Sequence, residues 1–522
     1  MTLEVFRNEP FLDFSSPAEL ELCRAAVAGV ESRLGEEYPL YIGGQPVAGA
    51  EIFEARDPAS PSTVVGRVHM GSPEHARKAV EAAREAFRRW ARVGPWERAA
   101  LLLRAGDILR QRRREMLGWL AFEVGKNWQQ SDGEIAEAID HFEWNARQLQ
   151  LWDRGREIVP LASEINQYRY LPLGVGVVIS PWNFPTTLPL GMAVAAIAAG
   201  NTVVLKPAEQ AAVIAHQLYS VFRDAGLPPG VLNLVPGPGP TVGDALVGDP
   251  DVQFVAFVGS RAVGTRIHSR ASGLAPGQRQ LKRVMTEMGG KNATIVTPAA
   301  DLSWAADEVV AAAFGYQGQK CSATSRLILT DEVHDRFLEL VLASLDRVTG
   351  DCGHPAENHW YGPLITPAAV AKVEQYIGLA RGTGRLLRQG SRLGDGNFLT
   401  PTVVDEVEPA ARVAQEEIFG PFLTVIRVRS LAEAVAVANS VEYALTGAVF
   451  SNDPAELDYV RENFLVGNLY LNRSSTGAMA GVHPFGGFKL SGTGPKVGSP
   501  DYLGFFLQAQ AITQRVRYPL AR

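Results

Sequence analysis

The stretch with the most regular pattern contains four apolar segments: GVGVVISP (174–181), NTVVLKP (201–207), VLNLVPG (231–237) and DVQFVAFVGS (251–260). Each segment has the character of a buried strand and leads through a turn into a helical pattern. This repetition predicts a parallel sheet with helices on both faces. Because open sheets of this kind bind nucleotides at the carboxyl ends of their strands, we expect ligand-binding residues directly after these segments.

Other patterns flank this sheet. Residues 1 to about 155 are mostly helical in pattern, with apolar positions spaced three and four residues apart. On the other side, KNATIVTP (291–298) begins a second α/β region that alternates through residue 470. The tail GFFLQAQAITQRVRY (504–518) carries apolar, β-forming residues and indicates an edge strand or an arm.

The composition is typical of a globular protein in a reducing compartment. Of 522 residues, 46% are hydrophobic and 20% are charged, which excludes a long disordered or fibrous chain. The net charge of −6 gives no general attraction to phosphate backbones, so we expect no nucleic-acid partner. The basic run RQRRRE (110–115) indicates a solvated helix face. Cys23, Cys321 and Cys352 form no disulfide framework.

Neither the N-terminal sequence nor the most apolar stretch favours a membrane or secreted protein. MTLEVFRNEPFLDF (1–14) lacks the basic start and apolar run of a secretory signal, so we expect a cytoplasmic protein. TLPLGMAVAAIAAGNTVVL (187–205) is interrupted by Pro189, Gly191 and Gly200. This stretch predicts a buried helix followed by a strand, with no membrane span.

Two places after the strands could bind a dinucleotide, although no standard phosphate-binding fingerprint is present. In FVGSRAVG (257–264), a strand ends at Gly259 and Ser260 and opens a helix whose free N–H groups could meet a pyrophosphate. Lys206 and Glu209 follow another strand, where a cation and an acceptor suit ribose hydroxyls. The alternatives are a simple helix cap at Ser260 and ordinary surface roles for Lys206 and Glu209.

Three side chains could supply the chemistry of a carbonyl reaction. Cys321 lies in the polar stretch GYQGQKCSATSR (315–326), whose neighbours Lys320, Gln319 and Ser322 could favour a thiolate. Glu287 lies beside apolar residues that could raise its pKa to that of a general base. Asn183, between two prolines, could be a fixed donor to an oxyanion. The alternatives are a buried inert cysteine, a strand-end glutamate and a turn asparagine.

A cluster of metal-like residues, CGHPAENH (352–359), contains one cysteine and two histidines within one loop. Its spacing fits no zinc pattern and no second ligand pair is near in the sequence, so we expect no metal.

Seven motifs occur in the order found in the aldehyde dehydrogenase superfamily: SPWNFP (180–185), LKPAEQ (205–210), FVGSRAVG (257–264), EMGGKNA (287–293), GQKCSA (318–323), EEIFGP (416–421) and PFGGFKLSG (484–492). The chain resembles this superfamily over nearly its whole length. The resemblance implies an α/β, aldehyde dehydrogenase-like fold in three parts. These are a Rossmann-like NAD-binding domain (1–140 and 160–286), an α/β catalytic domain (287–490) and a small β oligomerisation arm (141–159 and 491–522).

Within the superfamily, the chain most resembles the Δ1-pyrroline-5-carboxylate dehydrogenases, which oxidise L-glutamate γ-semialdehyde to L-glutamate in proline catabolism. The serine after the cysteine in QKCSA, the loop TGAMAGVHPFGGFKLSG (476–492) and the segment KVGSPDYL (496–503) carry this resemblance. The chain departs from the usual pattern at Met288, His483 and Ser499.

The resemblance also implies roles for individual residues. The Cys321 thiolate attacks the aldehyde, Asn183 and the Cys321 N–H hold the oxyanion, and Glu287 activates the water that hydrolyses the thioester. NAD contacts Ser180, Trp182, Lys206, Glu209, Gly259, Ser260, Glu417 and Phe419. The substrate contacts Phe184, Ser322, Gly477, Ala478 and Phe485. A carboxylate at position 209 favours NAD over NADP, because it accepts a 2′-hydroxyl and repels a 2′-phosphate.

Two alternative functions remain at this point. The enzyme could act on another short acidic aldehyde such as succinate semialdehyde, or the chain could be an inactive interaction protein on the same fold. As partners, the resemblance implies other copies of the chain, in a dimer or a hexamer built from dimers, and a proline dehydrogenase.

Overall fold

The four predicted strands belong to one eight-stranded sheet, and the predicted helices connect them. The structure is a computed structural model that describes residues 3–516. The strand order is β23-β11-β10-β7-β8-β9-β2-β3, and the five strands from β11 to β9 are parallel. The elements are β7 (Val175–Ile179), α6 (Thr187–Ala198), β8 (Thr202–Lys206), α7 (Ala212–Asp224), β9 (Leu232–Leu234), α8 (Asp244–Gly248), β10 (Val252–Val258), α9 (Arg261–Ser272), β11 (Arg283–Glu287) and β23 (Gly492–Thr493). The predicted parallel sheet is confirmed.

The N-terminal part is helical, as expected, but it also contains five strands that the sequence pattern did not indicate. Its helices are α1 (Pro17–Glu31), α2 (Pro73–Trp90), α3 (Pro95–Gln111), α4 (Arg113–Val124) and α5 (Trp128–Asp153). Its strands are β1 (Glu36–Tyr38), β2 (Leu40–Ile42), β3 (Gln45–Val47), β4 (Glu51–Arg56) and β5 (Val64–Met70). β2 and β3 extend the large sheet, and the other three form a small sheet of their own.

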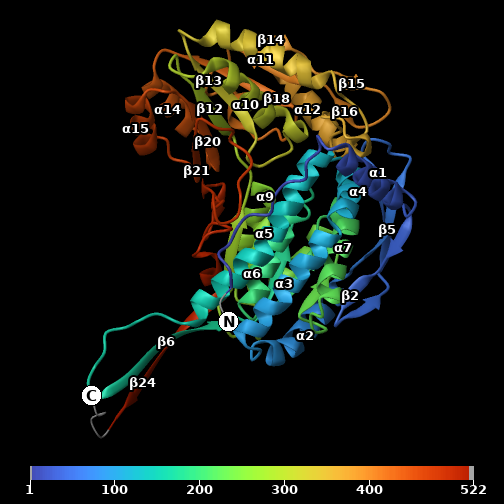
Figure 1. The fold of residues 1–522 in the computed structure, drawn as a ribbon, viewed down its shortest axis with the longest axis vertical. Coiled ribbons are helices and arrows are strands. Elements are labelled where there is room, and N and C mark those ends of the chain that lie inside the picture. The colour runs from blue at the N-terminus through green and yellow to red at the C-terminus, as the bar shows by residue number, and fades with distance from the viewer. Residues whose placement is uncertain (1–2, 517–522) are drawn as a thin grey trace.

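The second α/β region forms a seven-stranded sheet in the order β14-β17-β18-β13-β12-β20-β21, at the top of Figure 1. Its strands are β12 (Asn292–Val296), β13 (Thr324–Thr330), β14 (Arg385–Arg388), β17 (Thr402–Asp405), β18 (Phe422–Val428), β20 (Thr446–Phe450) and β21 (Asn468–Leu471). Its helices are α10 (Leu302–Phe314), α11 (His334–Thr349), α12 (Pro367–Ala380), α13 (Arg412–Gln415), α14 (Leu431–Asn439) and α15 (Pro454–Asn463). Two short strand pairs, β15 (Arg392–Leu393) with β16 (Phe398–Leu399) and β19 (Tyr443–Ala444) with β22 (Phe488–Lys489), lie outside it.

An arm projects from the body and consists of two antiparallel strands, β6 (Glu164–Pro172) and β24 (Leu507–Arg515). It is seen at the lower left of Figure 1. The tail strand agrees with the prediction, whereas its partner differs from the expected segment 141–159. Residues up to Asp153 continue α5, and the strand begins only at Glu164. The last part of the expected arm, 517–522, lies outside the described residues.

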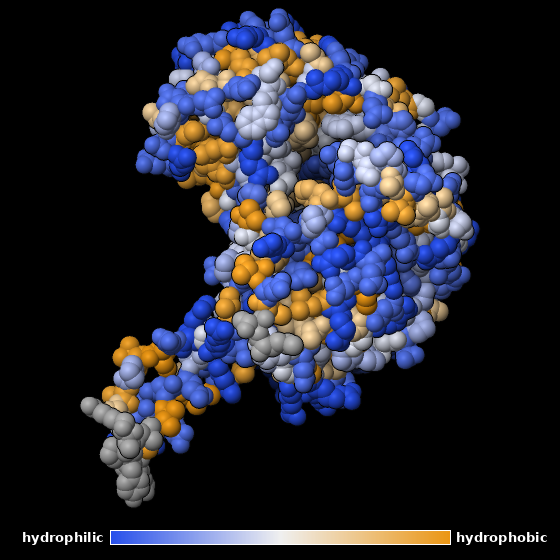
Figure 2. Space-filling model, in the orientation of Figure 1, coloured by the Kyte–Doolittle hydropathy of each residue, from blue (hydrophilic) through white to orange (hydrophobic). Residues whose placement is uncertain are grey.

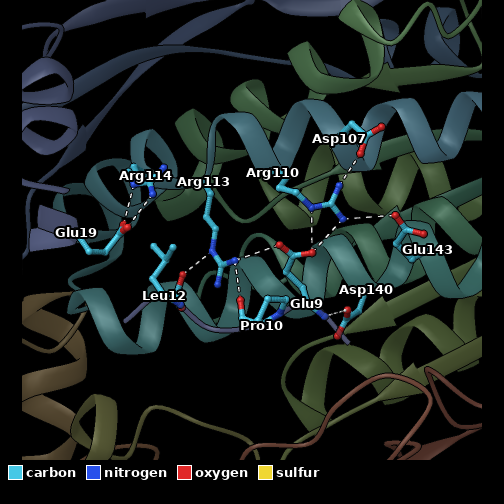
Figure 3. A network of polar contacts seen from close by, with 11 residues as sticks. Glu9, Pro10, Leu12, Glu19, Asp107, Arg110, Arg113, Arg114, Asp140 and Glu143 are labelled. Carbon is cyan, nitrogen blue, oxygen red and sulfur yellow. Dashed lines mark hydrogen bonds and ion pairs between the residues drawn. The ribbon is translucent and has the colours of Figure 1, made fainter. Parts of the chain in front are cut away.

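The expected solvated face at residues 110–115 is wrong. Arg113 is only 5% exposed, and its Nε donates to Asp132 at 2.6 Å. Arg110 and Arg113 both reach Glu9, in the segment before α1, as Figure 3 shows. The basic run therefore fastens the N-terminal segment to the helices.

The most apolar stretch forms the helix and strand that its interruptions predicted, α6 and β8. Nearly every residue of α6 is buried, since the helix packs against α5 and the large sheet. Among the described residues, no helix combines the length and the apolar composition that a membrane span needs.

Candidate active site

Cys321 follows a tight turn between α10 and β13. Tyr316 and Gln317 have φ values of 54° and 53°, and Gly318 has φ 68°, so three successive residues adopt the left-handed conformation. A side chain at Gly318 would lie 2.4 Å from the Gly420 carbonyl oxygen, so only glycine fits there. Such a strained turn persists only where its surroundings hold it, and it presents Cys321 to a cavity.

Asn183 lies beside the cysteine loop. Its side chain is 4% exposed, and its Nδ2 donates to the Gln319 carbonyl at 3.1 Å. The turn that carries Asn183 is held by Glu134, whose carboxylate accepts hydrogen bonds from Thr186 N–H at 2.6 Å and Thr187 N–H at 3.2 Å. The amide is therefore fixed on Gln319, which lies two residues before the nucleophile in the chain.

Glu287 ends β11 and faces the same cavity. Both of its carboxylate oxygens are buried, and no nitrogen or hydroxyl donor among the described residues bonds to them. Burial raises the pKa of Glu287 to about 8, as the apolar neighbours in the sequence predicted. A carboxylate with this pKa suits a general base, because it can take a proton near neutral pH.

The expected thiolate at Cys321 is not favoured by its surroundings. Burial, followed by the negative charge of Glu287, raises the pKa of the Cys321 thiol well above its ordinary range. Burial also lowers the pKa of the neighbouring Lys320 to about 7, so this lysine is a weak source of positive charge. The sulfur therefore rests as a thiol, and a base must remove its proton during attack.

The predicted cofactor residues gather at the carboxyl edge of the large sheet. Ile179 and Lys206 are paired at the ends of β7 and β8, and the Ser180 N–H donates to the Lys206 carbonyl at 3.1 Å. Glu209 follows β8, whereas Gly259 and Ser260 follow β10, with Ser260 as the N-cap of α9. The Lys206 ammonium is buried, which lowers its pKa, and its one hydrogen bond among the described residues goes to the Pro207 carbonyl. This edge combines a carboxylate, a cation and a helix N-terminus, which fits a dinucleotide.

Glu417 and Phe419 come from the other α/β region. Glu417 Oε1 accepts a hydrogen bond from Gly290 N–H at 2.9 Å, and a Cβ at Gly289 would lie 2.0 Å from the same oxygen. Because Gly289 and Gly290 have no side chains, the Glu417 carboxylate can lie against them. Phe419, at φ 62°, stacks edge-on against Trp182 with ring centroids 5.7 Å apart. The structure therefore brings all eight predicted cofactor residues to one edge or to the segment facing it.

A cavity of about 730 Å³ joins Cys321 and Glu287 to the predicted substrate residues. Glu287 and Cys321 line it, and all five predicted substrate residues line it as well: Phe184, Ser322, Gly477, Ala478 and Phe485. Gly477 and Ala478 donate no backbone hydrogen bond among the described residues. The carbonyls of Thr476 and Gly477 accept bonds from Arg473 at 3.0 and 2.8 Å. Within the described residues, the N–H groups of Gly477 and Ala478 are free for an anion.

Sequence reasoning missed three charged residues around this cavity. Glu137 of α5 lines it, and burial raises the pKa of Glu137 to about 8. Lys126 is fully buried, pairs with Glu134, and lies 3.6 Å from the centroid of the Phe184 ring. Arg473 holds the loop described above. Lys126 precedes α5 and Glu137 lies within it, and neither position has a chemical signature in the sequence.

The histidines of CGHPAENH have carboxylate partners of their own. His354 Nε2 lies 2.7 Å from Asp57, and His359 Nδ1 lies 2.7 Å from Asp351. Within residues 3–516, no group of three or more possible ligands has the geometry to hold a metal ion.

Comparison with known proteins agrees with this geometry. Residues 46–512 match the aldehyde dehydrogenase family. The chain belongs to this family. A 1-pyrroline-5-carboxylate dehydrogenase from Geobacillus thermodenitrificans is 45% identical over 516 residues, which cover 98% of this chain and 99% of that protein. The fold is accordingly that of an aldehyde dehydrogenase.

Two solved structures extend the comparison to the whole fold. A 1-pyrroline-5-carboxylate dehydrogenase from Thermus with bound NAD superposes with a TM-score of 0.97 at 46% identity, over 99% of this chain and 100% of that one. Proline utilization A from Bdellovibrio bacteriovorus gives a TM-score of 0.97 at 41% identity, over 99% of this chain and 54% of the longer protein.

Proposed function

We propose that this aldehyde dehydrogenase oxidises L-glutamate γ-semialdehyde, the open form of Δ1-pyrroline-5-carboxylate, to L-glutamate in proline catabolism, with NAD as its cofactor. The observation that carries the proposal is the single cavity in which Cys321 and Glu287 meet the free N–H groups of Gly477 and Ala478. The names and the full-length similarity of the relatives support the same reaction.

The catalytic steps use three residues. The Cys321 sulfur bonds to the aldehyde carbon as its proton passes to solvent water, and the carbonyl oxygen becomes an oxyanion held by the Asn183 amide and the Cys321 N–H. NAD, when bound at the carboxyl edge of the large sheet, would supply the acceptor for the hydride that leaves this carbon, and a thioester on Cys321 would remain. Glu287 then takes a proton from a water molecule that attacks the thioester. The carbon–sulfur bond breaks, glutamate leaves and Cys321 is restored.

The cofactor fits the carboxyl edge of the large sheet. Lys206 and Glu209 bind the adenosine ribose, and the α9 N-terminus with Gly259 and Ser260 binds the pyrophosphate. Ser180 and Trp182 lie along the same edge. Glu417 and Phe419 bind the nicotinamide ribose, since Glu417 can exchange its contact with Gly290 for ribose hydroxyls.

The substrate is recognised at both ends. Its α-carboxylate binds Ser322 and the N–H groups of Gly477 and Ala478, while Phe184 and Phe485 flank its aliphatic part. Glu137 lines the cavity and offers a hydrogen-bond acceptor to the α-ammonium, a group that succinate semialdehyde lacks. This difference favours glutamate semialdehyde over other short acidic aldehydes.

Steady-state kinetics with glutamate semialdehyde, succinate semialdehyde and propanal, each with NAD and with NADP, tests the proposal. We expect the highest kcat/KM with glutamate semialdehyde and NAD, and no turnover after Cys321→Ala. Cys352→Ala is the matched control, because Cys352 is also half-buried but is not among the residues that line the cavity. A higher kcat/KM with succinate semialdehyde, or full activity of Cys321→Ala, would contradict the assignment.

The chain acts as a homo-oligomer, a dimer or a hexamer built from dimers. Apolar side chains are exposed on and beside the arm, among them Val159 at 88% and Leu161 at 56%, and Figure 2 shows this apolar surface on the projecting part. Light scattering of the wild type and of Val159→Glu/Leu161→Glu tests this assembly, because the charges should dissociate it. An unchanged mass would contradict a role for this surface.

Two further proposals concern the cellular setting. A proline dehydrogenase is a possible partner, since it would supply the substrate, and the similarity to proline utilization A supports the link. A pull-down with purified proline dehydrogenase tests it. We also propose a cytoplasmic location, which cell fractionation tests.

A further inference from the structure

The segment before the first helix is an irregular strap, residues 3–16, that runs along the helices of the N-terminal part. Its backbone is fastened at several points (Figure 3). Glu9 N–H donates to Asp140 at 2.7 Å, Leu12 N–H donates to Asp132 at 2.9 Å, and the Pro10 carbonyl accepts from Arg113 at 2.9 Å. We call this segment the N-terminal strap.

One side chain of the strap reaches the loop that carries Gly477 and Ala478. Asn8 Nδ2 donates to the Ala480 carbonyl at 2.9 Å and to Asp140 Oδ2 at 2.7 Å. Asn8 thus joins α5 to a loop 472 residues away in the chain. Ala480 itself is buried and Asn8 is half-buried, so the bond is partly shielded from competing water.

A second contact lies one residue further along the loop. Gly481 has φ 77°, and a Cβ there would lie 2.9 Å from the Phe6 ring and 3.0 Å from the Trp144 ring. Phe6 and Trp144 meet edge-to-face with centroids 5.1 Å apart. The strap and α5 together therefore form a wall against which the loop rests.

The opposite side of the loop is held by Arg473. This side chain binds the Thr476 and Gly477 carbonyls, and His483 lies 2.8 Å from it. The loop is thus fixed by Arg473 before Gly477 and by Asn8 after Ala478. The residues between these two points line the cavity, and the strap itself lines that cavity through Phe11 and Phe14.

The match to the aldehyde dehydrogenase family begins at residue 46, after the strap, and contains Asn183, Glu287 and Cys321. The chemistry shared by the family thus lies outside the strap. The 1-pyrroline-5-carboxylate dehydrogenase from Geobacillus thermodenitrificans aligns over 98% of this chain, which is more of the chain than the family match covers.

We infer that Asn8 is a positioning residue for substrate specificity: through its bond to Ala480, it holds the Gly477 and Ala478 N–H groups where they bind the carboxylate of the substrate. This inference rests on the proposed function. Asn8 touches no reacting atom, so its loss weakens binding of the acidic aldehyde and leaves the chemical step unchanged.

Kinetics of Asn8→Ala tests this role. We expect the KM for glutamate semialdehyde to rise about tenfold, the size of one lost hydrogen bond, with kcat unchanged. The KM for propanal, which has no carboxylate, should not change. Arg7→Ala is the matched control, because Arg7 is an exposed neighbour on the same strap. Equal KM values in Asn8→Ala and Arg7→Ala, or equal rises for both aldehydes, would overturn the inference.

A second measurement separates this inference from the proposed function. Hydrogen–deuterium exchange of peptides covering residues 476–482 needs no substrate. We expect faster exchange there in Asn8→Ala than in Arg7→Ala, whereas equal exchange would overturn the inference even for an active enzyme. If the wild type does not prefer glutamate semialdehyde, the proposed function fails, and the exchange result still decides whether Asn8 holds the loop.

Discussion

The side-chain amide of Asn292 donates a hydrogen bond to the carbonyl oxygen of Cys321 at 2.7 Å. The same amide donates to the Ala323 carbonyl at 2.9 Å, and its oxygen accepts from Thr446 N–H at 3.0 Å. Asn292 opens β12, so one buried side chain connects the nucleophile loop to two strands of the catalytic sheet. The loop after Cys321 is further fixed by Ser475, whose hydroxyl donates to the Ser322 carbonyl at 2.9 Å.

Replacing Asn292 by alanine should therefore reduce both stability and activity. Three buried backbone groups would lose their partner, which we expect to lower the free energy of unfolding by about 2–4 kcal/mol. We expect kcat to fall about tenfold as the Cys321 loop loosens. Chemical denaturation and steady-state kinetics measure both effects. Asn439→Ala, which removes a half-buried asparagine bonded to the Asn463 carbonyl and the Leu465 N–H, is the control. Equal stabilities of the two variants would refute this role of Asn292.

Replacing Glu287 by glutamine should stop turnover after the first hydride transfer. Without a base, the thioester on Cys321 accumulates, so a burst of about one NADH per site should precede a steady rate that is lower by about 10²–10⁴-fold. Stopped-flow absorbance and mass spectrometry of Cys321 detect the burst and the adduct. Glu21→Gln, on the exposed face of α1, serves as control. A wild-type steady rate would exclude Glu287 as the base.

The same substitution should change the pH dependence of stability. The folded-state pKa of Glu287 is about 8, above its ordinary value of 4.5, so between these values the folded protein holds a proton that the unfolded chain releases. The contribution of Glu287 to stability is thus present below pH 4.5 and is lost as the pH rises through 8. We expect the free energy of unfolding of Glu287→Gln to exceed that of the wild type by about 1–2 kcal/mol near pH 9. Near pH 4, the two free energies of unfolding should be equal. Urea denaturation at both pH values measures the difference, and a constant offset would contradict it.

Replacing Glu209 by glutamine should relax the choice of cofactor. The substitution removes a carboxylate that accepts a ribose hydroxyl and repels a phosphate, so NAD should bind more weakly and NADP relatively better. We expect the ratio of kcat/KM for NADP to that for NAD to rise about tenfold, or about 1.4 kcal/mol. Gln210→Ala controls for changes at the neighbouring position. An unchanged ratio would show that position 209 does not face the 2′ group.

Replacing Ser322 by alanine should weaken binding of the acidic substrate selectively. The Ser322 side chain lines the cavity, and we place its hydroxyl on the substrate carboxylate. The KM for glutamate semialdehyde should rise about tenfold, and the KM for propanal should stay the same. Ser325→Ala, three residues along in β13, is the control. If both aldehydes are affected alike, Ser322 acts on the Cys321 loop and not on the carboxylate.

Much of the central fold could be predicted from the sequence, because the buried parallel strands are continuous apolar runs bounded by glycine and proline. Strands β1 to β3 escaped prediction, since three residues such as EEY (36–38) are too few to show a period. The arm strand β6 was misplaced for a different reason. EINQYRYLP (164–172) buries none of its residues fully, so no apolar run marks where it begins.

The arginines of residues 110–115 show how distant partners escape local patterns. Arg113 pairs with Asp132, 19 residues away, and Arg110 with Glu9, 101 residues away. A basic run on a helix indicates a solvated face, yet folding brings distant carboxylates to it. Asn8 and Ala480, 472 residues apart, are a further contact that no spacing in the chain announces.

The sequence by itself determined which reactive groups this protein has and the order in which they occur: a thiol, a carboxyl group, an amide and the seven motifs that identify the family. Only the tertiary structure decided the protonation and the hydrogen bonds of these groups. The neighbours of Cys321 in the chain favoured a thiolate, but burial and Glu287 raise the pKa of its thiol. The physical reason is that a pKa or a hydrogen bond depends on everything within a few ångströms, and in a folded chain most of those atoms come from residues far away in sequence.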